Sequence, residues 1–232
     1  MEVAYFREPR PGPELQMQTA VAKQIPFLFP CTDRPSWTAG QVSIGAGMPD
    51  LTVISSDPEV VTLSSVNLPH AHILAYLRTV GRARLDTIVQ RIRGPRKTVA
   101  QCLEALVLAQ VVDEGDAVFS LRPCWRNILA EIITIEVKVK DWRRAVEQAG
   151  RNTIFAHRSY VALPVMVADR IRSESIFRHI GAGVLAVDDS GEVQIVSRAP
   201  RNRPLVWTYY YELASLTARH FGGCLNAIHC AD

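Results

Sequence analysis

A glutamate and a lysine two residues apart are the first side chains in this sequence that could do chemistry together. Glu136 and Lys138 lie in the run from Ile132 to Lys140, in which apolar and polar residues alternate strictly. Such alternation predicts a β-strand, and residues two apart on a strand point to the same side of the sheet. We therefore expect the Glu136 carboxylate and the Lys138 ammonium group to share one space.

A second carboxylate lies upstream, at Asp50. The residues from Gln41 to Ser55 predict a strand that enters and leaves a tight bend at Asp50, since Pro49 precedes it and an apolar run follows it. Two converging carboxylates can hold Mg²⁺, which keeps several of its waters. The metal lowers the pKa of a bound water and offsets charge on a phosphate, and a lysine can orient that water or stabilise developing negative charge. This is the chemistry of phosphodiester hydrolysis, with Mg²⁺ or, as an alternative, Mn²⁺.

Two short segments together are similar to a known motif. Met48-Pro49-Asp50-Leu51, followed by Ile135-Glu136-Val137-Lys138, resembles the PD-(D/E)xK nuclease superfamily, which has the restriction-endonuclease-like fold. The resemblance implies an α/β protein with a mixed central sheet flanked by helices. It also implies that Asp50 and Glu136 bind the metal and that Lys138 assists the nucleophile.

The same resemblance implies two accessory residues. Some members of the superfamily use an acid in the first helix, which corresponds to Glu14. Others use a glutamine in the helix after the lysine strand, which corresponds to Gln148.

The order of the elements expected from the sequence agrees with that superfamily. The matching elements are a helix over 14–24, the strand at Asp50, the strand at Glu136, a helix over 141–157 and a strand over 160–163. The other elements expected are an exposed arm over 1–13, strands over 25–30, 58–64, 183–187 and 193–197, and helices over 168–179 and from 207 to about 221. Residues 32–40 are expected to form a loop.

The segment between the two motif strands has a different pattern of apolar and polar residues. Amphipathic helices are predicted over 70–80, 85–92 and 97–110, followed by a hairpin over 111–121. This order is typical of a winged helix-turn-helix. The sequence therefore predicts an α+β winged helix over 67–125, inserted into a discontinuous nuclease-like core over 1–66 and 126–232. Insertion at a loop is tolerated because it adds little closure entropy.

Charge is concentrated in this predicted insert. The whole chain carries only +3, yet basic residues outnumber the acids Asp86 and Glu104 between positions 69 and 110. Local basic density matters more than net charge for binding phosphates, so DNA is the expected partner. The residues expected to contact DNA are Arg91 and Arg93, on phosphates, and Arg96 and Lys97, at the start of the recognition helix.

Other functions remain open at this point. A Glu-x-Lys pair is also typical of a solvated strand face, and a nuclease fold does not guarantee activity. The alternatives are a catalytically inactive DNA-binding protein or regulator, and a protein-interaction subunit of a defence or repair complex. A homodimer is a further option, because cutting both strands of a duplex often uses two active sites.

The composition excludes several classes of protein. The sequence is 48% hydrophobic, which argues against a disordered chain, and it lacks a run of about 18 apolar residues, which argues against a membrane span. The N-terminal residues lack the apolar region of a secretory signal. We therefore expect a cytoplasmic protein whose five cysteines are reduced thiols.

Overall fold

The chain folds into two compact units, and each unit is built from two separate stretches of the sequence. The computed structural model describes residues 3–30, 33–45 and 47–229, with side chains described up to residue 222. One unit comprises residues 1–55 and 131–205, and the other comprises 56–130 and 206–232. Each unit is described separately below.

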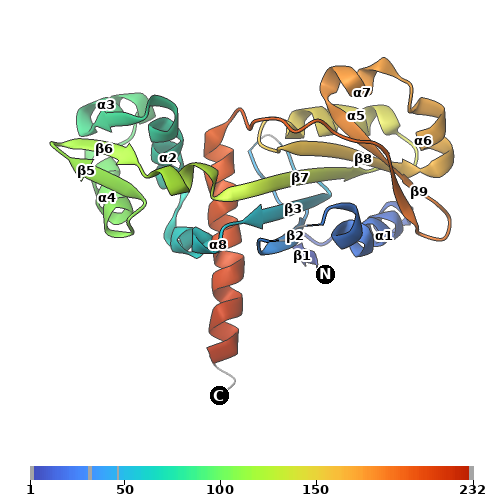
Figure 1. The fold of residues 1–232 in the computed structure, drawn as a ribbon, viewed down its shortest axis with the longest axis horizontal. Coiled ribbons are helices and arrows are strands. Elements are labelled where there is room, and N and C mark those ends of the chain that lie inside the picture. The colour runs from blue at the N-terminus through green and yellow to red at the C-terminus, as the bar shows by residue number, and fades with distance from the viewer. Residues whose placement is uncertain (1–2, 31–32, 46, 230–232) are drawn as a thin grey trace. The chain divides into compact units, whose positions relative to one another are not determined.

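The first unit is built on a seven-stranded sheet (Figure 1). Its strands follow the order β1-β2-β3-β7-β8-β9-β10. Their bounds are Val3–Tyr5 (β1), Ser36–Gly40 (β2), Leu51–Ser56 (β3), Leu129–Val137 (β7), Arg158–Pro164 (β8), Ala182–Val187 (β9) and Val193–Ser197 (β10). Strands β7, β8 and β9 are parallel, as are β1 and β2, whereas β2–β3 and β9–β10 are antiparallel. The fold is therefore α/β with a mixed sheet, as the sequence predicted.

Helices cover both faces of this sheet (Figure 1). Helix α1 (Pro13–Leu28) packs on one face, and helices α5 (Trp142–Asn152), α6 (Val165–Ile171) and α7 (Ser175–Ile180) pack on the other. Because side chains alternate along β7, Ile133 and Ile135 join the core under α1. Glu136 points to the opposite side, where it meets a residue of α5.

Helix α1 is longer than the sequence predicts. The strand expected over 25–30 is wrong, because the helix continues through Pro26 to Leu28. Val21 and Ile25 are buried against the sheet, and this packing outweighs the loss of one backbone hydrogen bond at a proline close to the helix end. Helix α1 therefore covers the sheet as far as Leu28.

Two other expectations near the N-terminus are wrong. Residues 36–40, expected as a loop, form β2, and the strand expected over 58–64 is a 3-10 helix, η1 (Pro58–Ser65). Strand β2 is buried along nearly its whole length, but it is short and contains Ser36, Thr38 and Gly40, residue types that are common in loops. Its Gly40 lies against Tyr5, and a Cβ there would be 2.3 Å from the Tyr5 ring. The strand at Asp50 begins only at Leu51.

Two further segments differ in detail. The helix expected over 168–179 is two helices, α6 and α7, which are separated at residues 172–174. The expected N-terminal arm contains β1, which pairs with β2. None of the helices within the described part of the chain is both long and apolar enough to cross a membrane.

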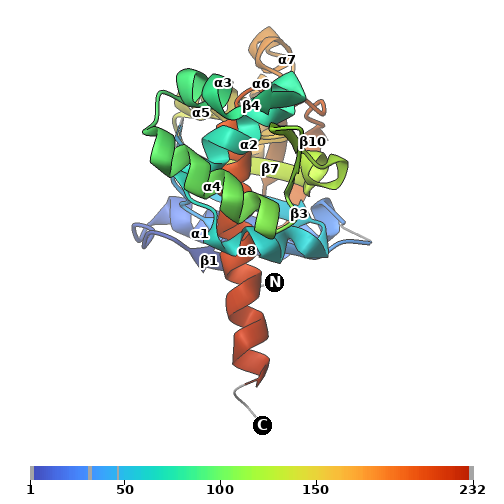
Figure 2. The same ribbon diagram turned by 90° about the vertical axis from the view of Figure 1, so that its left-hand side faces the viewer.

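The second unit contains three short helices, a small sheet and a long helix (Figure 2). The helices are α2 (Leu68–Val80), α3 (Leu85–Ile92) and α4 (Arg96–Leu108), and the sheet has the order β4-β6-β5. Its strands are β4 (Arg82–Arg84), β5 (Val112–Gly115) and β6 (Val118–Leu121). A second 3-10 helix, η2 (Pro123–Asn127), and helix α8 (Trp207–His229) complete the unit.

Helix α8 is part of this second unit because it packs on η1 and α2. The Tyr210 hydroxyl accepts a hydrogen bond from the Leu129 amide, and the Ser215 hydroxyl donates one to the Val66 carbonyl. The Arg78 guanidinium lies 3.6 Å from the centre of the Trp207 ring. The contacts thus place residues 56–66, 126–130 and 206–232 with the segment 67–125, whereas the sequence-based division placed them with the sheet.

Candidate functional site

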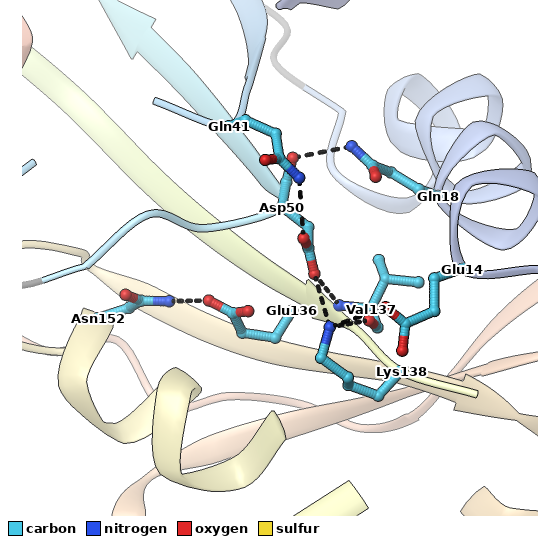
Figure 3. Close-up of polar contacts among 8 residues, drawn as sticks. All are labelled: Glu14, Gln18, Gln41, Asp50, Glu136, Val137, Lys138 and Asn152. Carbon is cyan, nitrogen blue, oxygen red and sulfur yellow. Dashed lines mark hydrogen bonds and ion pairs between the residues drawn. The ribbon is translucent and has the colours of Figure 1, made fainter. Parts of the chain in front are cut away.

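Asp50 and Lys138 meet at one end of the central strands, at the point where β3 begins and β7 ends (Figure 3). The Lys138 ammonium nitrogen lies 3.7 Å from Asp50 Oδ2. The same carboxylate oxygen accepts a hydrogen bond of 2.8 Å from the Val137 amide. Both side chains are largely shielded, with exposed fractions of 16% for Asp50 and 15% for Lys138. The structure thus brings together two residues that are distant in the sequence.

Two glutamines fix the position of Asp50 (Figure 3). The Gln41 amide donates to Asp50 Oδ1 at 3.3 Å, and the Gln18 amide donates to the Asp50 backbone carbonyl at 3.0 Å. Gln41 has a φ of 54°, in the left-handed region, immediately after β2. This turn directs the chain away from β2 and leaves the Gln41 side chain beside Asp50.

Glu136 is buried on the α5 side of the sheet, with an exposed fraction of 2%. Its Oε1 accepts a hydrogen bond of 2.7 Å from the Asn152 amide of α5 (Figure 3). Its Oε2 is buried and has no hydrogen-bond partner among the described residues. This burial contradicts the alternative of a solvated strand face for Glu136.

Burial raises the pKa of both carboxyl groups. Loss of solvent and, to a smaller extent, the nearby Asp50 carboxylate raise the pKa of Glu136 to about 8, against opposing effects of Asn152, Lys138 and Arg151. Burial also raises the pKa of Asp50, although the Val137 amide and Lys138 act in the other direction. The site therefore disfavours two negative charges unless a cation joins it.

Lys138 also contacts the first helix. Its ammonium nitrogen lies 3.2 Å from Glu14 Oε2 and donates a hydrogen bond to the Val137 carbonyl at 2.9 Å. Glu14 is about half exposed, with an exposed side-chain fraction of 53%. The accessory position expected at Glu14 thus borders the site through Lys138 (Figure 3).

The other accessory position, Gln148, lies on α5. Gln148 is four residues before Asn152, so the two side chains leave the same face of the helix. Its Oε1 is buried without a hydrogen-bond partner among the described residues. Among the described residues, Gln148 forms no hydrogen bond to Asp50 or Glu136.

Carboxylate oxygens are the kind of donor that a hard cation such as Mg²⁺ takes. The two carboxylates carry raised pKa values, and Glu136 has an unpartnered oxygen. No cluster of three or more His, Cys, Asp or Glu side chains suited to a metal occurs in the described ranges. Mg²⁺ is commonly held by one or two carboxylates together with waters and substrate phosphates, so two suffice.

The basic residues expected to contact DNA belong to the second unit. Arg91 lies in the last turn of α3, Arg93 follows that helix, and Arg96 and Lys97 open α4; all four are exposed. Arg96 forms an ion pair with Asp86 of α3. The guanidinium of Arg96 is therefore already partnered on this surface.

Sequence reasoning missed the residues that support the carboxylates. Asn152, Gln41 and Gln18 each contact Asp50 or Glu136, yet none belongs to a motif. For Asn152 a signal was available, because it lies one helical turn after Gln148 on the same face. For Gln41 and Gln18 the sequence holds no such signal, since only the folded chain brings them to Asp50.

The chain was compared with protein-family models, curated proteins and solved structures. No protein-family model, curated protein or solved structure matches the chain.

Proposed function

We propose that this protein is a metal-dependent DNA nuclease of the PD-(D/E)xK type, with its site at Asp50, Glu136 and Lys138. The observation that carries the proposal is the convergence of a buried Glu136, a shielded Asp50 and Lys138 at the ends of two neighbouring strands. Charged residues are seldom buried without a partner, so this arrangement favours a site with a cation.

The residues of the chain have distinct parts in the proposed reaction. Asp50 and Glu136 would hold Mg²⁺, which when bound supplies an acidified water and neutralises charge on the scissile phosphate. Lys138, whose ammonium group lies beside Asp50, would orient the attacking water or stabilise the negative charge that develops on the phosphate. Asn152 and Gln41 hold the two carboxylates in position.

The second unit supports DNA as the substrate. Its elements follow the order α2-β4-α3-α4-β5-β6, which is the order of a winged helix. Its exposed basic residues at the junction of α3 and α4 suit contacts with phosphates. We therefore assign it the part of engaging DNA.

The direct test is cleavage of plasmid DNA and of labelled oligonucleotides with Mg²⁺ or Mn²⁺. We expect cleavage by the wild type and a loss of about a hundredfold or more for Lys138→Ala, because removing one electrostatic stabiliser commonly lowers a rate by that factor. Asp50→Asn is expected to be inactive as well. Lys140→Ala is the matched control, since Lys140 is an exposed lysine of the same segment.

The outcome distinguishes the proposal from its main alternative. Equal cleavage by wild type and Lys138→Ala would remove the assigned site. Salt-dependent DNA binding without cleavage, and without metal binding in calorimetry, would instead indicate a catalytically inactive DNA-binding protein. The contacts of Lys138 with Glu14 and with the Val137 carbonyl favour this alternative, because they occupy its ammonium group.

A further inference from the structure

A pocket lies at the opposite end of β7 from Asp50 and Lys138. It encloses about 370 Å³ on the α1 face of the sheet, and its lining includes Glu131 of β7 and Arg158 of β8. The last residue of α1, Leu28, lines this pocket, as do Glu131 and Ile133 near the start of β7. The volume of the pocket is in the range of small-ligand sites.

The pocket has an excess of positive charge. Glu131 lies between two guanidinium groups, with its Oε1 3.6 Å from Arg158 Nε and its Oε2 3.2 Å from Arg201 Nε. Asp33 and Arg34 add one charge of each sign to the lining, and Arg198 adds a further positive charge. The carboxylate of Glu131 is thus already neutralised, and the pocket as a whole favours an anion.

Arg198 is available to that anion. It follows the end of β10, it is exposed, and its guanidinium forms no ion pair or hydrogen bond with any residue that the structure describes. Arginine presents several N–H groups in a planar fork that matches the oxygens of a phosphate. Arg158, by contrast, donates to the Ala199 carbonyl at 2.6 Å and is held in place.

The wall of the pocket is aromatic. Half-buried Phe29 and buried Tyr160 both line it, with ring centres 5.1 Å apart. Leu28 and Ile133 extend the apolar surface. An apolar wall of this kind suits a planar ring, and aromatic side chains are common stacking partners of bases.

We propose that this pocket binds one nucleoside monophosphate unit, with its phosphate at Arg198 and its base against Phe29. The unit has two sources, a free nucleotide or a nucleotide within a single strand. The site is separate from Asp50 and Glu136, since Glu131 and Glu136 are about 17 Å apart at the rise of an extended strand. It therefore does not depend on the nuclease activity.

The test is calorimetry on the full chain in EDTA, which keeps metal-dependent chemistry silent. The probes are AMP, adenosine, inorganic phosphate and a 5′-phosphorylated deoxyadenosine tetranucleotide. We expect AMP to bind more tightly than adenosine or phosphate alone. Comparable binding of the tetranucleotide identifies a strand as an accepted source, and binding of AMP alone identifies a free nucleotide.

Three variants locate the binding. We expect Arg198→Ala to weaken AMP binding by about tenfold or more, because it removes a charge-assisted hydrogen bond. Arg172→Ala removes the same charge at an exposed position outside the pocket and should change nothing. Phe29→Leu should weaken AMP more than phosphate. Absence of AMP binding, or equal affinity of wild type and Arg198→Ala, overturns the proposal, whatever the cleavage assay gives.

Discussion

At the scale of single residues, Glu136 is the most informative side chain of the candidate site. Its carboxyl group is buried, has one hydrogen-bond partner in Asn152 and lies near Asp50. A pKa of about 8 means that most copies of Glu136 carry a proton at neutral pH when no cation is bound. Metal binding at neutral pH must then release this proton.

Metal affinity is therefore expected to rise with pH. Below the pKa of Glu136, each unit of pH should strengthen Mn²⁺ binding by about tenfold, and the gain should level off above about pH 8. Calorimetric titration with Mn²⁺ at several pH values between 6 and 9 measures this. Glu136→Gln should bind weakly throughout, and a wild-type affinity that does not change with pH would contradict the assignment.

The stability of the metal-free protein should change in the opposite direction. The pKa of Glu136 is raised from 4.5 to about 8, so its contribution to the free energy of unfolding is complete below about pH 4.5 and is lost as pH rises through about 8. Urea unfolding in EDTA should therefore show wild type losing stability between pH 6 and pH 9. Glu136→Gln should remove most of this slope, whereas Glu147→Gln, at an exposed position of α5, should keep it.

At the scale of elements, the sequence predicted best where apolar and polar residues recur with the period of a helix or a strand. The helices at 70–80 and 85–92 and the strand at 132–140 carry such patterns, and the structure has α2, α3 and β7 at those places. Strand β2 was not predicted, because it is only five residues long and contains small and polar residues that are typical of loops. The end of α1 was also missed, since its packing on the sheet overrides Pro26.

In the candidate site, too, some residues could be predicted from the sequence and others could not. Asp50, Glu136 and Lys138 could be selected because their residue types and spacing match a motif. The supporting contacts of Gln18 and Gln41 could not, because they depend on where α1 and β2 lie in the folded chain. Local patterns thus identify reactive side chains more readily than the groups that orient them.

Asn152 allows a test of how α5 supports the site. Asn152→Ala removes the hydrogen bond to Glu136 Oε1 and leaves that buried oxygen without a hydrogen-bond partner. We therefore expect a loss of about 1–3 kcal/mol in the free energy of unfolding. It should also raise the pKa of Glu136 and move the pH dependence of Mn²⁺ binding upward. Glu147→Ala on the exposed side of the helix is the control. An unchanged pH profile would show that Asn152 has only a structural part.

At the scale of the whole molecule, the two units do not coincide with continuous stretches of sequence. The sequence-based division separated the segment 67–125 from the sheet, whereas the contacts group residues 56–130 together with α8. It could not identify α8 as part of the second unit, because the apolar residues of a closing helix do not say which core they join. Helix α8 joins the second unit through the hydrogen bonds of Tyr210 with Leu129 and of Ser215 with Val66.

Tyr210 provides a measure of this attachment. Tyr210→Phe removes the acceptor of the Leu129 amide, which is then buried without a partner, and we expect a loss of about 1–3 kcal/mol in the stability of the second unit. Tyr209→Phe, one residue earlier in α8, should have little effect. Hydrogen exchange measured by mass spectrometry on α2 and η1 would report the change. Equal exchange in the two variants would mean that α8 does not hold this unit together.

Helix α8 is far along the sequence from the residues on which it packs, and this has a consequence for the growing polypeptide. During translation, residues 56–130 leave the ribosome long before residues 206–229, on which their packing depends. The strands that carry Asp50 and Glu136, by contrast, are complete once residue 205 has emerged. We therefore expect the candidate site to form first in the nascent chain, and the second unit to fold only after α8 has been synthesised. A chain arrested near residue 205 would hold the candidate site without a finished second unit.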